Sequence, residues 1–169
     1  GTFAPKTTGP DFLPAQLGNE ILGQFGMMGR IGEAVREKAG LAYYAQSELG
    51  MGLGPITWQV VAGVNPNNVD KAIALIRKEL SRFTTELVTE EELADVRSAV
   101  VGRLPLSLES NAGIASALLN LERYKHSLDY IRELPARIAA VTREDILRVA
   151  QTYWQLDNMV IASAGVALS

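Results

Sequence analysis

The chain has 169 residues, of which 47% are hydrophobic and 21% are charged, so the sequence predicts one globular domain spanning residues 1–169. Sixteen basic and nineteen acidic residues give a net charge of −3 without a dense basic run, which argues against nucleic acid as a partner. The absence of cysteine excludes disulfides, thiolate metal sites and a cysteine nucleophile. No apolar run reaches the roughly 20 residues that a membrane span requires, so we expect no span.

The first third of the chain predicts a strand end followed by two helices. Residues 1–4 resemble the end of a strand whose beginning is missing, so we expect a chain truncated at its N-terminus. Residues 12–25 carry apolar side chains at helical spacing, which predicts the first helix. The glycine-rich run GQFGMMGR, residues 23–30, predicts a short hinge. A second helix follows and ends at Gly40, a typical C-terminal cap.

The next segment predicts a β-hairpin that leads into a long helix. Two runs rich in β-forming residues lie at 42–49 and 56–64, and the loop GMGLGP separates them. In the second run, apolar residues alternate with other residues, as in a strand. Asn65 is then a helix N-cap and Pro66 a first helical residue. Apolar residues recur every three or four positions over 69–87, so this helix is expected to pack on the sheet.

The rest of the chain predicts four more helices and a final strand. Thr89 and Glu92 have the spacing of a capping box, and Pro105 is expected to kink or end the helix that they begin. The later elements are expected at residues 112–124, 128–138, 143–154 (helices) and 158–166 (strand). Together, few strands and many helices predict an α+β fold, with a mostly antiparallel sheet covered by helices on one face.

Several kinds of catalytic site are excluded by the side chains that they need. A histidine-rich zinc site cannot form, because His126 is the only histidine, and no neighbouring pattern supports a serine triad around it. The glutamates at 90–92 are typical of a helix N-terminus, where the helix dipole favours negative charge. The glycine runs lack the spacing and the Lys-Ser/Thr ending of a phosphate-binding loop and are interpreted as turns.

One arginine and two tyrosines remain as candidates. Arg36 lies near the end of the second helix, and Tyr43 and Tyr44 open the first strand of the hairpin. One interpretation is a solvated arginine that pairs with Glu33 or Glu37, with tyrosines covering the sheet. The other is a guanidinium and a phenol that face one cleft.

Three separated segments resemble one protein family. The runs GRIGEAVREKAGLAYY, GRLPLSLESNAGIASALL and IAAVTREDILRVAQTYW resemble the C-terminal domain of the pitrilysin-like zinc proteases, which include insulysin and the mitochondrial processing peptidases. The resemblance covers residues 11–165. It implies one half of a clamshell, in which a homologous N-terminal domain or subunit carries the inverted zinc motif and this half completes the active site.

The resemblance also implies site residues, a cofactor and partners. By the family's motif, Arg36 and Tyr43 contact the substrate. Independently of the resemblance, the alternation of side chains along a strand predicts that Tyr44 points to the opposite face. No cofactor is expected in this chain, zinc is expected in the partner domain, and the isolated chain is expected to be inactive. A peptide substrate and the zinc-bearing half are the expected partners, and an exposed sheet edge would favour a homo-oligomer. The alternative is a non-catalytic scaffold or peptide-binding relative, like the core-type subunits of respiratory complexes in this superfamily.

Overall fold

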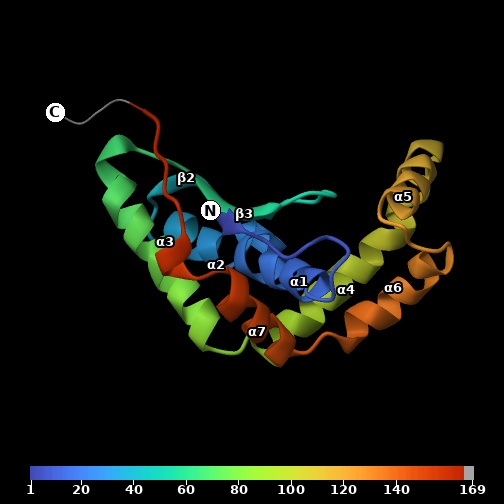
Figure 1. The fold of residues 1–169 in the computed structure, drawn as a ribbon. Helices are drawn as coiled ribbons and strands as arrows, with labels where there is room; N and C mark the ends of the chain where they lie inside the picture. The colour runs from blue at the N-terminus through green and yellow to red at the C-terminus, as the bar shows by residue number, and fades with distance from the viewer. Residues whose placement is uncertain (166–169) are drawn as a thin grey trace.

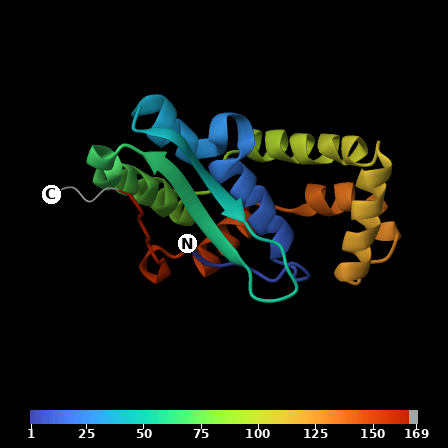
Figure 2. The same ribbon diagram turned by 90° about the horizontal axis from the view of Figure 1, so that it is seen from above.

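The computed structural model describes residues 1–165, and of Met27 and Met28 it describes the backbone alone. The fold is α+β: a three-stranded antiparallel sheet lies on a layer of helices, and the described helices that cover it lie on one face (Figures 1 and 2). The strand order is β1-β3-β2, with β1 at Thr2–Phe3, β2 at Ala42–Leu49 and β3 at Thr57–Val64. The predicted fold class and hairpin are therefore confirmed.

The expected hinge at residues 23–30 is wrong for most of its length. Helix α1 spans Phe12–Gly23, only Gln24 interrupts it, and α2 already begins at Phe25 and runs to Gly32. The left-handed φ of +64° at Gly29 brings its backbone against the end of α1, where an added Cβ would lie 2.6 Å from the Ile21 carbonyl oxygen. The glycines thus permit close packing of two helices rather than an open hinge.

The second predicted helix ends as expected but changes type on the way. After α2, residues Glu33–Lys38 form a π-helix, η1. Gly40 follows with a left-handed φ of +63°, and its N–H donates to the Arg36 carbonyl oxygen at 3.0 Å, so the glycine cap is confirmed.

Helix α3, Val69–Thr85, packs beneath the sheet in the position predicted for the long helix. A short 3₁₀ helix, Pro66–Asn68, precedes it, and the Asn65 side chain caps that helix by accepting a hydrogen bond from the Asn67 N–H at 3.0 Å. The predicted cap is correct, although it begins the 3₁₀ turn rather than the α-helix itself.

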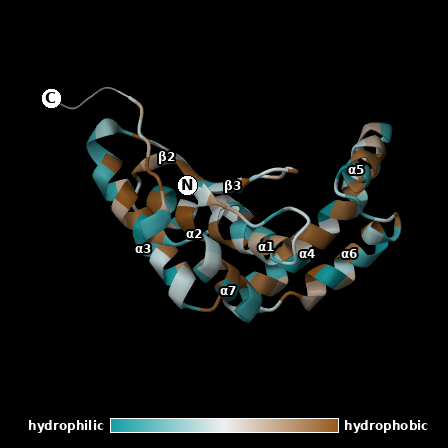
Figure 3. Cartoon of the chain, viewed as in Figure 1, coloured by the Kyte–Doolittle hydropathy of each residue, from teal (hydrophilic) through white to brown (hydrophobic). Residues whose placement is uncertain are grey.

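Helices α4, α5 and α6 extend away from the sheet (Figure 1). They span Glu90–Ser107, Asn111–Arg123 and Asp129–Ala140. Thr89 and Glu92 form the predicted capping box, and α4 continues two residues beyond Pro105 before it ends. Hydrophobic residues occur along these helices as well as beneath the sheet (Figure 3), and several on α5 are exposed.

The strand predicted at 158–166 is not observed in its described part, residues 158–165. Helix α7, Arg143–Tyr153, is followed by a 3₁₀ turn, Leu156–Asn158, and then by irregular backbone. Only Val160 forms strand-like bonds, both of them to Gly1. A strand needs a partner along its length, and within residues 1–165 only Gly1 pairs with this segment. Val166 lies outside the described residues.

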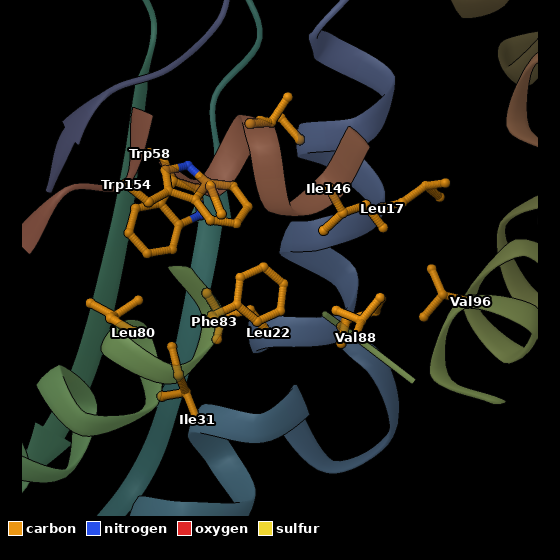
Figure 4. Packing of buried hydrophobic residues seen from close by; sticks show 14 of the residues in the cluster. Leu17, Leu22, Ile31, Trp58, Leu80, Phe83, Val88, Val96, Ile146 and Trp154 are labelled. Atoms are coloured by element: carbon orange, nitrogen blue, oxygen red, sulfur yellow. The ribbon is translucent and has the colours of Figure 1, made fainter. Parts of the chain in front are cut away.

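The core joins the sheet to helices from both ends of the chain. Trp154, at the end of α7, stacks on Trp58 of β3 with ring centroids 4.7 Å apart, and Phe83 of α3 lies 5.6 Å from Trp154 (Figure 4). Beside them, the Asn19 side-chain oxygen accepts hydrogen bonds from Trp58 Nε1 and Ser47 Oγ, both at 2.8 Å. This buried network fixes α1 against both long strands.

Candidate active-site surface

Arg36 lies on the π-helix η1, one turn before the chain enters β2. Its guanidinium is partly exposed, and its Nε lies 3.5 Å from Glu37 Oε1, while Glu33 pairs with Lys38 at 2.8 Å. The ion pair with Glu37 is one of the two pairings expected if Arg36 is a solvated surface arginine. Such exposed pairs are weak, so this contact leaves the guanidinium available to another partner.

Tyr43 is the extra residue of a β-bulge. Ala42 pairs with Val64 and Tyr44 with Gly63, so Tyr43 has no residue opposite it. Regular alternation would place Tyr43 on the same face as Ala45 and Ser47, which are fully buried. The bulge instead turns the phenol outward, where it is 87% exposed.

The prediction that Tyr44 points to the face opposite Tyr43 is wrong. The two rings contact each other in a T-shaped arrangement with centroids 6.5 Å apart, which opposite faces of a strand would not allow. The bulge is the physical reason, because it removes one step of the alternation. Tyr44 lies over Gly63, where an added Cβ would be 2.5 Å from the ring.

Arg36 and Tyr43 lie on either side of the Gly40 turn and are presented at the same end of the hairpin. Within residues 1–165, no hydrogen bond joins their side chains, and neither residue lines one of the two described cavities. The Tyr43 ring is exposed to solvent and the Arg36 guanidinium is partly exposed. The arrangement suits contact with a molecule that a second surface holds in place.

A small cavity of about 330 Å³ lies between α2, η1 and α4. On its wall, Arg30 donates to Glu92 through Nε at 2.7 Å and Nη2 at 2.6 Å. Partial burial by itself would raise the pKa of Glu92, but hydrogen bonds from Arg30 and the Thr89 N–H outweigh it and lower the pKa below its usual value. The carboxylate is therefore firmly ionised and serves as a structural link.

A larger groove of about 1050 Å³ runs between β3, α3 and the C-terminal segment. Tyr44 lies at its margin, and its walls include main-chain atoms as well as apolar side chains. The groove is distinct from the surface that carries Arg36 and Tyr43.

Zinc does not fit the described part of this chain. Residues 1–165 bring together no group of three or more potential His, Cys, Asp or Glu ligands. The ring of His126, the only histidine, stacks on Tyr130 with centroids 3.9 Å apart. In the same range, no helix is both long and apolar enough to cross a bilayer.

Sequence reasoning missed two residues that organise this region. Asn19 bonds to both long strands, and Arg30 links α2 to α4 across 62 positions of sequence. An isolated asparagine in an apolar helix was the only local signal for the first. Arg30 had no local signal in the sequence, because tertiary packing decides that Glu92 is its partner.

Comparison with known proteins identifies the family. The profile described as "Peptidase M16 inactive domain" matches residues 2–100. The chain is 25% identical over 151 residues to "Probable inactive metalloprotease YmfF" of Bacillus subtilis, covering 89% of this chain and 34% of the relative. It is 29% identical over 126 residues to "Uncharacterized zinc protease SCO5738" of Streptomyces coelicolor, covering 75% of this chain and 28% of that protein. The chain thus spans about a third of these relatives.

The fold agrees with that assignment. A peptidase M16 inactive domain from Pseudomonas fluorescens superposes with a TM-score of 0.83 at 23% identity, covering 92% of this chain and 37% of that one. This likeness establishes the shared fold, and the profile match establishes the family. The chain belongs to the peptidase M16 inactive-domain family, which confirms the resemblance to the C-terminal domain of the pitrilysin-like zinc proteases.

Proposed function

We propose that this chain is the substrate-contacting, non-zinc half of a zinc-dependent metalloendopeptidase, completing an active site whose metal is held by a zinc-bearing N-terminal domain or subunit. The observation that carries the proposal is the bulge at Tyr43, which turns a phenol hydroxyl into solvent beside the turn that follows Arg36. Family membership supports the pairing with a zinc-bearing half.

In this proposal the two side chains act as hydrogen-bond donors to a peptide. The Tyr43 hydroxyl and the Arg36 guanidinium approach the carbonyl oxygen of the scissile bond or its neighbours. Because negative charge grows on that oxygen during hydrolysis, a donor held in position binds the transition state more tightly than the substrate. The zinc half supplies the metal chemistry, and this chain supplies donors and one wall of the substrate site.

The test is peptide hydrolysis by the assembled protein, using a mixed peptide library with zinc present. The chain alone should be inactive, and activity should depend on the zinc-bearing half. Tyr43→Phe should lower kcat by about 10²–10³ if the hydroxyl stabilises the oxyanion. Arg36→Ala should lower kcat/KM, while zinc content and assembly stay unchanged.

Matched controls lie on α6, away from the hairpin. Tyr130→Phe removes a hydroxyl and Arg132→Ala removes an exposed guanidinium, and neither should alter turnover. Tyr44 is unsuitable as a control because its ring contacts that of Tyr43. Unchanged hydrolysis in both Arg36→Ala and Tyr43→Phe would rule out the proposed roles.

The second candidate is a non-catalytic scaffold or peptide-binding relative. The pairing of Arg36 with Glu37 favours it, because that contact gives the arginine an ordinary surface role. The name of the Bacillus subtilis relative also describes an inactive protein. A stable assembly of both halves that hydrolyses no peptide of the library would support this candidate.

A further inference from the structure

The ring of Tyr44 lies on a glycine of the neighbouring strand. Tyr44 pairs with Gly63 across β2 and β3. Three atoms of its ring lie close to the position that a Gly63 Cβ would take, at 2.5 Å for Cε1, 3.0 Å for Cδ1 and 3.1 Å for Cζ. The ring therefore occupies space on β3 that is free only because residue 63 has no side chain.

Gly63 is not required by the backbone of β3. Its φ does not lie in the left-handed region, in contrast to those of Gly29 and Gly40. Glycine inside a strand is destabilising, because it loses more conformational freedom on folding than other residues do. What Gly63 provides in the folded chain is room for the Tyr44 ring.

The Tyr43 ring packs against the Tyr44 ring in turn. The two rings are T-shaped, with centroids 6.5 Å apart and an angle of 87° between their planes, which is a favoured aromatic geometry. Within residues 1–165, the hydroxyl of the exposed Tyr43 forms no hydrogen bond. The packing of its ring is therefore the contact that sets the direction of the phenol.

We propose that Tyr44, held on Gly63, is a positioning residue for the Tyr43 hydroxyl. The β-bulge turns Tyr43 outward, and the contact with Tyr44 then selects one of the three staggered χ1 rotamers. A donor that is oriented before the substrate arrives stabilises the transition state more than one that must first be ordered. The inference rests on the proposed function, in which the Tyr43 hydroxyl contacts the substrate.

The orientation of Tyr43 is measured by NMR in the chain alone. Three-bond couplings give the χ1 populations of Tyr43, and contacts between ring protons report its proximity to Tyr44. One rotamer should dominate in the unchanged chain. Tyr44→Ala should spread the population over at least two rotamers, whereas Tyr44→Phe, which keeps the ring, should preserve the dominant one.

Gly63→Ala tests the same contact without removing the ring. The added methyl group needs the space of the Tyr44 ring, so the ring should rotate away and the Tyr43 couplings should average as in Tyr44→Ala. In a chain that already carries Tyr44→Ala, Gly63→Ala should have no further effect on the couplings. The matched control is Gly54→Ala, in the loop between the strands, where an added Cβ meets nothing within 4 Å.

The effect on hydrolysis is measured in the assembled protein with zinc present. Tyr44→Ala and Gly63→Ala should each lower kcat about three- to tenfold, because the hydroxyl remains but is correctly oriented for only part of the time. KM and zinc content should stay the same, and the conservative variant Tyr44→Phe should restore kcat. In a chain that carries Tyr43→Phe, Tyr44→Ala should lower kcat no further, since no hydroxyl is left to orient.

Two results would overturn the inference and leave the proposed function standing. One is an unchanged χ1 population of Tyr43 in both Tyr44→Ala and Gly63→Ala. The other is an equal loss of kcat from Tyr44→Ala with and without the Tyr43 hydroxyl, which would mean that Tyr44 acts on the substrate directly. Full activity of Tyr43→Phe would instead disprove the proposed role of the hydroxyl and the kinetic part of this inference, while the couplings would still decide the orientation.

Discussion

Trp154 stacks on Trp58 at 4.7 Å with an angle of 21° between the ring planes, and this contact joins the last helix of the chain to the central strand. Both indoles are fully buried. Gly18 of α1 lies against the same ring, where an added Cβ would be 3.0 Å from the Trp154 indole. The Trp154 side chain therefore contacts both α1 and the sheet from the end of α7.

Trp154→Ala should lower the free energy of unfolding by about 3–5 kcal/mol, because it removes the stack and leaves a cavity that three elements surround. Chemical denaturation followed by circular dichroism measures the change. Leu118→Ala, on the exposed face of α5, should change stability by only about 0.5 kcal/mol. Equal losses in the two variants would contradict the central role of the stack.

The residues that follow the family profile contribute to the same core. Ile138, Ile146, Val149 and Trp154 lie beyond residue 100 and pack in the cluster that contains Leu17, Leu22 and Trp58. We therefore expect a fragment of residues 2–100 to lack a cooperative unfolding transition, whereas residues 1–165 should unfold in one step. Near-ultraviolet circular dichroism, which reports the packed indoles, distinguishes the outcomes. A fragment that unfolds cooperatively would disprove the proposal of one domain.

Two glycines in helices should respond oppositely to alanine. Gly23 ends α1 against β2, and an added Cβ would lie 2.1 Å from the Ser47 backbone nitrogen. Gly23→Ala should therefore cost about 3 kcal/mol or more. Gly102, within α4, has open space around it, so Gly102→Ala should stabilise the chain by about 0.5–1 kcal/mol. Thermal unfolding of the two variants checks both signs.

The Arg30–Glu92 pair should make stability depend on pH. The pKa of Glu92 is lower in the folded chain than in the unfolded chain. The ionised carboxylate therefore contributes to the free energy of unfolding at neutral pH. That contribution is lost as the pH falls below about 5 and Glu92 becomes protonated.

Glu92→Gln keeps a helix-capping side chain but removes the charge, so it should cost about 1–3 kcal/mol at pH 7. The difference from the unchanged chain should shrink towards pH 3 in urea unfolding curves. Glu122→Gln alters an exposed pair with Lys125 and should leave the curves nearly unchanged. If the free energies of unfolding of Glu92→Gln and the unchanged chain differ by the same amount at pH 7 and pH 3, the proposed link between Glu92 ionisation and stability is excluded.

Local patterns in the sequence predicted most of the helices and the hairpin correctly. The capping box at Thr89 and the glycine cap at Gly40 use groups a few positions apart, so their chemistry can be recognised in the sequence itself. The spacing of apolar residues likewise predicted α3 and β3. The family resemblance rested on three such local segments, and the profile match confirms it.

The candidate site was predicted only in part. Arg36 and Tyr43 could be selected from the sequence by resemblance, but the direction of each tyrosine could not. That direction depends on the β-bulge, in which Ala42 and Tyr44 pair with two adjacent residues of β3. The bulge is defined by the pairing of two strands and not by either strand alone. The expected final strand failed for a similar reason, because strand formation depends on a partner and not on β-propensity alone.

The sequence by itself determined most of the helices, the hairpin, where several of these elements end, and the family, because each depends on neighbours in the chain. Only the tertiary structure decided the outward turn of Tyr43, the link from Arg30 to Glu92 and the stacking of Trp154 on Trp58. These features arise where distant segments meet, and packing, desolvation and strand pairing fix them after the local elements have formed.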